Sequence, residues 1–156
     1  GGMWYQIKAE PDEEGHGVPW DEASRVKSQY HTVYALLGVA AATVANRPGA
    51  HELLETMLQE QKDYWIDDYG LVWDQYDEAF SEPAPVHALG TLIHTIEAYM
   101  AAAEATTEPE WLDRAEKMTA FAYKVASKNN WRIPEYYDEE WQPSLEAGKL
   151  CNDGRR

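Results

Sequence analysis

The stretch SEPAPVHALGTLIHTIEAYMAAAEATTEPEWLDRAEKMTAFAYKVASKNN, residues 81–130, decides the fold class. In its first half, apolar side chains recur every three or four residues, at Val86, Leu89, Ile93, Ile96, Met100 and Ala103. In its second half, they recur in the same way at Trp111, Ala115, Met118, Ala122 and Val125. This spacing is typical of one face of a helix, so the stretch predicts two consecutive helices.

Local signals predict where these two helices begin and end. Ser81 is a candidate N-cap with Pro83 in the first turn, which predicts a start at Ser81. Thr107 followed by Glu110 has the spacing of a capping box, which predicts the second start, and this helix runs to about Lys128. Because the connection is short, the two helices are expected to pack antiparallel.

The preceding residues predict a second pair of the same kind, over residues 21–45 and 49–66. Asp21 is the candidate N-cap, and Asn46 is the candidate stop before Pro48. The apolar faces are expected at Val26, Tyr30, Val33, Leu37, Ala41 and Val44, and at Leu54, Met57, Leu58, Gln61 and Trp65. Short strands are expected at residues 3–7 and 132–133, and a loop around Gly70 fills residues 67–80.

The resulting fold class is all-α, with residues 1–156 forming a single domain of two antiparallel helix pairs. The spacing from Tyr30 to His94, about 64 residues, is long for common helical solenoids. It suits one turn of an α/α barrel, in which long loops at one end build the site. We therefore expect a partial α/α toroid.

Composition excludes several classes of partner. The formal net charge of −15 argues against nucleic acids, whose phosphates need Lys and Arg, and against anionic membranes. No apolar run approaches the length needed to span a bilayer. The single cysteine, Cys151, cannot form an internal disulfide, so we expect a cytoplasmic protein.

Aromatic residues are unusually frequent, with seven Trp and ten Tyr but two Phe. Trp and Tyr combine an apolar body with a polar group, which suits both a packed core and the face of a sugar ring. Both uses stay open from composition alone.

Three ordered stretches carry a resemblance to a known family. They are GGMWY at residues 1–5 with KSQY at 27–30, IHTIEA at 93–98 with WLDRA at 111–115, and WRIPEYYDEEW at 131–141. Together they resemble the N-acylglucosamine 2-epimerase family over nearly the whole chain. The resemblance implies a barrel of six helix pairs, of which this chain supplies the second and third.

The resemblance also implies a reaction. Members of the family interconvert sugars by moving a proton at C2, or between C1 and C2, with two histidines as acid and base and no cofactor. It places those histidines after Arg156 and a sugar-binding arginine before Gly1, so no catalytic residue is expected here. The function expected is an incomplete part of a carbohydrate 2-epimerase or aldose–ketose isomerase, and whether the chain alone is an enzyme stays open. The alternative is a non-catalytic helical module that self-associates.

The expected site is centred on His94, which matches a family histidine that lines the sugar pocket, with Glu97 one turn further along. The family often has Asn where this chain has Gly90. The other expected substrate-binding residues are the loop aromatics Trp73, Tyr76, Tyr136 and Trp141. Without the resemblance, the favoured interpretation of His94 is a core histidine bonded to a carbonyl, with Glu97 on the surface.

The remaining polar residues give weaker signals. His16, His31, His51 and His87 are expected to be structural or exposed, and the acidic run 138–140 to be a solvated loop rather than a metal site. A neutral sugar is the expected ligand, because the chain lacks the Arg or Lys clusters that bind phosphate. A two-pair fragment of a barrel exposes apolar flanks, so we also expect a homo-oligomer.

Overall fold

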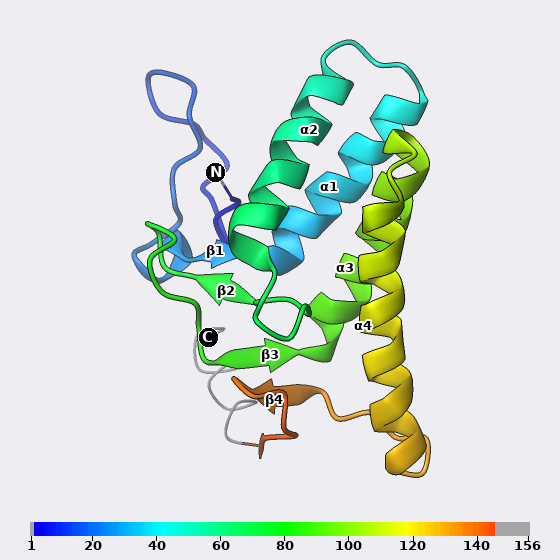
Figure 1. Ribbon diagram of the computed structural model, residues 1–156. Coiled ribbons are helices and arrows are strands. Elements are labelled where there is room, and N and C mark those ends of the chain that lie inside the picture. Colours follow the sequence, from blue (N-terminus) through cyan, green and yellow to red (C-terminus); the bar gives the residue numbers. More distant parts are fainter. Residues whose placement is uncertain (1, 146–156) are drawn as a thin grey trace.

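The computed structural model describes residues 2–145, and four helices dominate this part of the chain (Figure 1). They are α1 (Gln29–Val44), α2 (Ala50–Glu60), α3 (Leu89–Thr106) and α4 (Pro109–Lys128). A π-helical turn, η2 (Gln61–Trp65), continues α2 by five residues. The helices pack as the antiparallel pairs α1–α2 and α3–α4, with α1 and α3 also packed on each other. The all-α prediction is therefore confirmed.

Two small antiparallel sheets lie at the end of the bundle where α1 and α3 begin (Figure 1). In one sheet, β1 (Lys27–Ser28) pairs with β2 (Gln75–Tyr76). In the other, β3 (Val86–Ala88) pairs with β4 (Tyr136–Asp138). Because β1 runs directly into α1 and β3 directly into α3, each sheet fixes the position at which one of these helices starts.

The predicted starts of α1 and α3 are wrong by eight residues each. Asp21 accepts hydrogen bonds from the backbone and hydroxyl of Ser24, but the turn it begins is a short 3-10 helix, η1 (Ala23–Arg25). Ser81 lies in a loop, because the residues before Leu89 are extended and paired with β4. The extended residues before Leu89 form backbone hydrogen bonds with β4, which is far away in sequence. Capping signals and periodicity are local, so they cannot predict this pairing.

Two further local predictions are wrong. Thr107 does not cap α4: it takes a left-handed conformation, φ 60°, and its N–H bonds to the carbonyl of Ala103 at the end of α3. Glu110 binds Arg114 and Lys62 instead of completing a capping box. The strand expected at 132–133 lies at Tyr136–Asp138.

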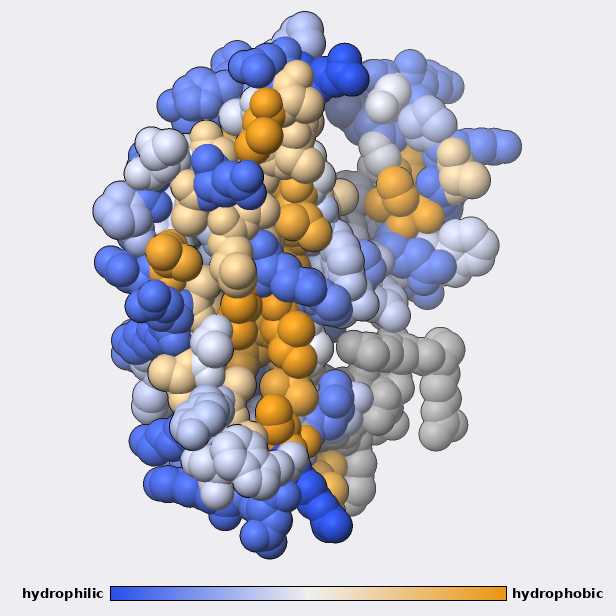
Figure 2. Space-filling model, turned by 90° about the vertical axis from the view of Figure 1, so that its right-hand side faces the viewer, coloured by the Kyte–Doolittle hydropathy of each residue, from blue (hydrophilic) through white to orange (hydrophobic). Residues whose placement is uncertain are grey.

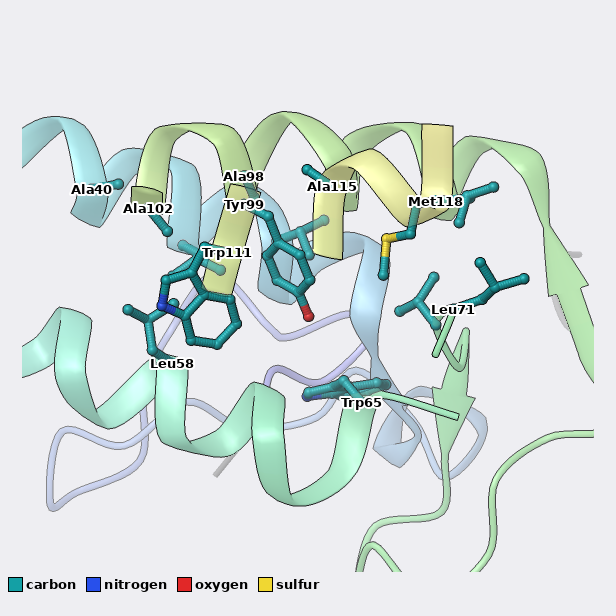
Figure 3. Close-up of a cluster of buried hydrophobic side chains, with 14 of the residues drawn as sticks. Ala40, Leu58, Trp65, Leu71, Ala98, Tyr99, Ala102, Trp111, Ala115 and Met118 are labelled. Carbon is teal, nitrogen blue, oxygen red and sulfur yellow. The ribbon is translucent and has the colours of Figure 1, made fainter. Parts of the chain in front are cut away.

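The core lies between the helices, and its largest side chains come from η2, α3 and α4. Trp111 and Tyr99 meet edge to face with centroids 5.0 Å apart, and they project with Trp65 into the space between the helices (Figure 3). The predicted faces of α2 and α4 are confirmed by the burial of Leu54, Leu58, Gln61, Trp65, Trp111, Ala115 and Met118.

The faces predicted for α1 and α3 are partly wrong. The buried residues of these helices are Gln29, Thr32, Val33, Leu36 and Ala40 in α1, and Thr91, Leu92, Thr95, Ala98, Tyr99 and Ala102 in α3. Tyr30, Val44, Ile93 and Met100 are exposed instead. Both helices carry small or apolar residues on most sides, so periodicity alone does not single out the face that packs. None of the helices within residues 2–145 is long and apolar enough to cross a bilayer.

Candidate functional site

A cavity of about 370 Å³ opens between the first turns of α1 and α3, beside the two small sheets. Its polar lining residues are Ser28, His31, Asp74, Gln75, Thr91, His94 and Glu135. Its aromatic lining residues are Tyr5, Tyr30 and Tyr136. The cavity therefore brings together side chains from five separate parts of the chain.

Asp74 organises this end of the bundle. Its carboxylate accepts hydrogen bonds from the backbone N–H of Ala88, at 2.8 Å, and from the hydroxyl of Thr91. Its backbone carbonyl accepts the N–H of Gln29, at 3.0 Å. A carboxylate at a helix N-terminus is also favoured by the helix dipole. Through these bonds one buried residue fixes the starts of both α1 and α3 relative to each other.

His94 sits in the second turn of α3 and is bound by two side chains. Its Nδ1 lies 2.6 Å from Glu97 Oε2, and its Nε2 lies 3.0 Å from the Tyr34 hydroxyl of α1. Tyr30 packs edge-on against the same ring, with centroids 5.4 Å apart. A hydrogen bond with Tyr30, with burial as a lesser cause, raises the pKa of Tyr34, so this hydroxyl stays protonated at neutral pH.

Tyr34 and His94 lie at equivalent positions of α1 and α3, at the same distance from the start of each helix. Tyr34 and His94 are 60 residues apart, and the same offset relates the first residues of α1 and α3. It also relates Tyr30 to Gly90 and His31 to Thr91, all four of which line the cavity. The spacing of about 64 residues estimated from sequence was close to this offset, but it paired Tyr30 with His94.

The structure brings together only some of the predicted site residues. His94 and Tyr136 line the cavity, and Glu97 adjoins it through His94. Gly90 also lines it, and a Cβ built there would meet no heavy atom closer than the Glu135 carboxylate at 3.9 Å.

The other three predicted aromatics do not line this cavity. Tyr76 packs edge-on against Trp65, with centroids 5.6 Å apart. Trp73 and Trp141 stack on either side of His87, with centroids at 5.0 and 4.1 Å. Trp141 also donates from its indole to buried Asp67, at 2.6 Å. The structure therefore places Tyr76, Trp73 and Trp141 outside the cavity that His94 lines.

Of the two other histidines near this end of the bundle, His87 agrees with the sequence expectation and His31 does not. His87 is fully buried, and its Nδ1 lies 2.9 Å from the Val72 carbonyl. Burial lowers its pKa, with smaller opposing contributions from Asp67 and from backbone hydrogen bonds, so it is a structural residue. His31, expected to be structural or exposed, lines the cavity with Nδ1 2.8 Å from the Ser28 hydroxyl. In the first turn of α1, His31 occupies the place that Thr91, another lining residue, occupies in α3, 60 residues later.

No metal centre is evident within residues 2–145, where no three His, Cys, Asp or Glu side chains are grouped closely enough to hold an ion. Asp138 of the acidic run uses its carboxylate to accept the backbone N–H groups of Glu140 and Gln142. This run therefore stabilises a turn. Cys151 and Gly1 lie outside the described residues.

Known proteins resemble this chain in both sequence and fold. The D-mannose isomerase of Thermobifida fusca is 33% identical over 140 residues, which is 85% of this chain and 34% of that protein. The D-mannose isomerase of Pseudomonas cannabina pv. alisalensis is 30% identical over 125 residues, 79% of this chain and 30% of that protein. The chain thus spans about a third of the length of these relatives.

Solved structures agree on the fold. A crystal structure of D-mannose isomerase matches with a TM-score of 0.74 and 22% identity, over 92% of this chain and 39% of that one. The cellobiose 2-epimerase from Spirochaeta thermophila matches with a TM-score of 0.69 and 23% identity, over 90% and 39%. The model of the N-acylglucosamine 2-epimerase (GlcNAc 2-epimerase) family matches residues 5–152. The chain therefore belongs to the N-acylglucosamine 2-epimerase family.

Proposed function

We propose that this chain forms part of the sugar-binding wall of a carbohydrate 2-epimerase or aldose–ketose isomerase, and that it binds a neutral hexose beside His94. The observation that carries the proposal is the cavity of about 370 Å³ between the starts of α1 and α3, with His94 in its wall. Because the chain covers about a third of its curated relatives, the reaction of the whole protein is part of the proposal.

The size and chemistry of the cavity support this ligand. Its volume lies within the range of about 300–1,000 Å³ that small-molecule sites occupy. Asp74 and Glu135 supply carboxylate acceptors for sugar hydroxyls, and Tyr30 and Tyr136 supply aromatic surface. No lining residue is Arg or Lys, so the phosphate of a phosphorylated sugar would find no cationic Arg or Lys partner in this wall.

The chemical step that we propose for the whole protein is proton transfer at C2, or between C1 and C2, of the sugar. Such a step needs an acid and a base within hydrogen-bond reach of the reacting carbons. Family resemblance assigns that pair to histidines that lie outside these 156 residues. The part played by this wall is then to bind the hydroxyls and orient the ring. The reducing cytoplasm suits a chain with one cysteine, and we propose it as the location.

A hexose titration followed by amide NMR shifts tests the binding proposal. We expect saturable shifts at His31, Thr91, His94 and Tyr136 with D-mannose, and an affinity of about 1 mM, or roughly 4 kcal/mol. His94→Ala should abolish these shifts. His51→Ala removes an exposed histidine of α2 and is the matched control that should leave them intact. An absence of shifts at tens of millimolar hexose would contradict the proposal.

The second candidate function is self-association as a helical module, and one surface favours it. A largely apolar groove of about 480 Å³ lies between α3 and α4, and its lining residues are Met100, Leu112, Ala115, Glu116, Thr119, Ala120 and Tyr123. Figure 2 shows apolar side chains gathered in a strip along this face. An exposed apolar groove is a candidate surface for contact with another protein. A second copy of the chain is the occupant that we propose for this candidate.

A further inference from the structure

Tyr34, His94 and Glu97 form a continuous hydrogen-bonded chain that joins the two helices beside the cavity. The Tyr34 hydroxyl lies 3.0 Å from His94 Nε2, and His94 Nδ1 lies 2.6 Å from Glu97 Oε2. Both ring nitrogens of His94 are therefore occupied, one from α1 and one from α3.

The donors and acceptors of this chain can be ordered by their chemistry. A carboxylate only accepts hydrogen bonds, so the bond to Glu97 needs a proton on His94 Nδ1. A neutral imidazole carries one ring proton, which leaves Nε2 as an acceptor. The Tyr34 hydroxyl must then donate to Nε2. The bond that one nitrogen makes thereby sets the tautomer of the other.

Ring packing holds the imidazole in place for these bonds. Tyr30 meets the ring edge-on at 5.4 Å, and the Tyr34 ring lies at 4.7 Å, tilted by 41°. His94 is 29% exposed at its side chain, so it still borders the open cavity. A half-buried ring with a fixed orientation is a pre-organised contact for a ligand.

We propose that Glu97 is a positioning residue that fixes His94 as its Nδ1–H tautomer, so that Nε2 accepts a hydrogen bond from a sugar hydroxyl. In the ligand-free protein the Tyr34 hydroxyl donates to Nε2. When the sugar binds, a sugar hydroxyl replaces the Tyr34 hydroxyl as this donor. This inference rests on the proposed function, because it assigns roles within the same sugar site. It replaces the expectation that Glu97 contacts the sugar itself.

The tautomer can be measured without any ligand. Two-bond ¹H–¹⁵N correlations of the His94 ring at pH 8.5, where an ordinary imidazole is neutral, distinguish a protonated nitrogen from an acceptor nitrogen. We expect a protonated Nδ1 in the unaltered chain and in Tyr34→Phe. Glu97→Ala should move the proton to Nε2, the nitrogen that an imidazole protonates preferentially in water.

Two more variants separate positioning from a structural effect. Glu97→Gln keeps an acceptor oxygen and should retain the Nδ1–H tautomer. Glu104→Ala removes an exposed carboxylate from the same helix and should change nothing. A proton on Nε2 in the unaltered chain, or an unchanged tautomer in Glu97→Ala, would overturn the proposal.

Hexose titrations of the same variants test the exchange of hydroxyls. Tyr34→Phe should tighten D-mannose binding by about fivefold, because the sugar no longer competes with the Tyr34 hydroxyl for Nε2. Glu97→Ala should weaken it by a similar factor. Weaker binding by Tyr34→Phe would overturn the role of Tyr34. If no variant binds hexose but the tautomer changes as expected, the sugar site fails and the assignment of Glu97 stands.

Discussion

Gln29 at the start of α1 and Gln61 in the turn after α2 hydrogen-bond to each other through both side-chain amides, although 32 residues separate them. The two bonds measure 2.6 and 3.2 Å. Tyr99 of α3 donates its hydroxyl to the same Gln61 oxygen at 2.9 Å. Burial raises the pKa of Tyr99 well above its ordinary value, so this hydroxyl remains a donor. Three helical segments thus meet in one fully buried polar network.

Tyr99→Phe tests how much this network stabilises the fold. The free energy of unfolding should fall by about 0.5–1.5 kcal/mol, near the lower limit because Gln61 keeps its bond from Gln29. Urea unfolding followed by circular dichroism measures the change. Tyr123→Phe, at a position that is 63% exposed, is the matched control and should leave the midpoint unaltered. Equal midpoints for both variants would show that the network contributes nothing.

His87 should make stability depend on pH. Burial lowers the pKa of His87 below its value of about 6.5 in the unfolded chain, so the unfolded state binds the proton more readily. The stabilising contribution is therefore complete above about pH 6.5 and is lost as the pH falls toward the folded pKa. The slope contributed by this residue is at most about 1.4 kcal/mol per pH unit.

His87→Gln should flatten that part of the stability profile, which urea unfolding between pH 7.5 and 5.5 would record. His51→Gln, at an exposed position of α2, should reproduce the slope of the unaltered chain. A slope unchanged by His87→Gln would assign the pH dependence to other groups.

Gly90→Asn should add a polar group to the cavity without disturbing its wall. The nearest heavy atom to a new Cβ is 3.9 Å away, and glycine costs helix stability near the start of α3. We expect unchanged or slightly higher stability and an up to tenfold tighter D-mannose affinity, worth about one hydrogen bond. Gly38→Asn, on the exposed part of α1, is the control for stability alone. Weaker hexose binding by Gly90→Asn would show that the space is needed by the ligand.

The apolar groove between α3 and α4 should drive self-association. Sedimentation velocity at micromolar concentration should show a species larger than the 17.8 kDa chain. Met100→Glu places a charge in the groove and should shift the population to the monomer, whereas Glu104→Gln, at an exposed position of the same helix, should not. A single 17.8 kDa species for the unaltered chain would contradict this prediction.

Residues 1–156 alone should not isomerise D-mannose to a measurable extent. General acid–base catalysis contributes about 10² to 10⁴ in rate for each positioned group, and the proposal places the reacting pair outside these residues. A coupled assay for fructose formation checks this. Turnover that is lost in His31→Ala or His94→Ala would instead assign the chemistry to the two histidines of this cavity.

The sequence by itself determined the all-α class, the extents of α2 and α4 and the faces on which they pack. These helices have strong apolar stripes bounded by polar residues. The burial of Leu54, Leu58, Trp111 and Met118 could therefore be predicted from the local sequence alone. The family motif also directed attention to His94, which lines the cavity.

Only the tertiary structure decided where α1 and α3 begin and which of their sides are buried. Their starts depend on strand pairs formed with residues far away in sequence, such as His87 with Tyr137. The same long-range packing places Trp73 and Trp141 against His87 and brings His31 into the cavity. Periodicity reports local geometry, whereas burial and site membership depend on neighbours that the chain acquires when it folds.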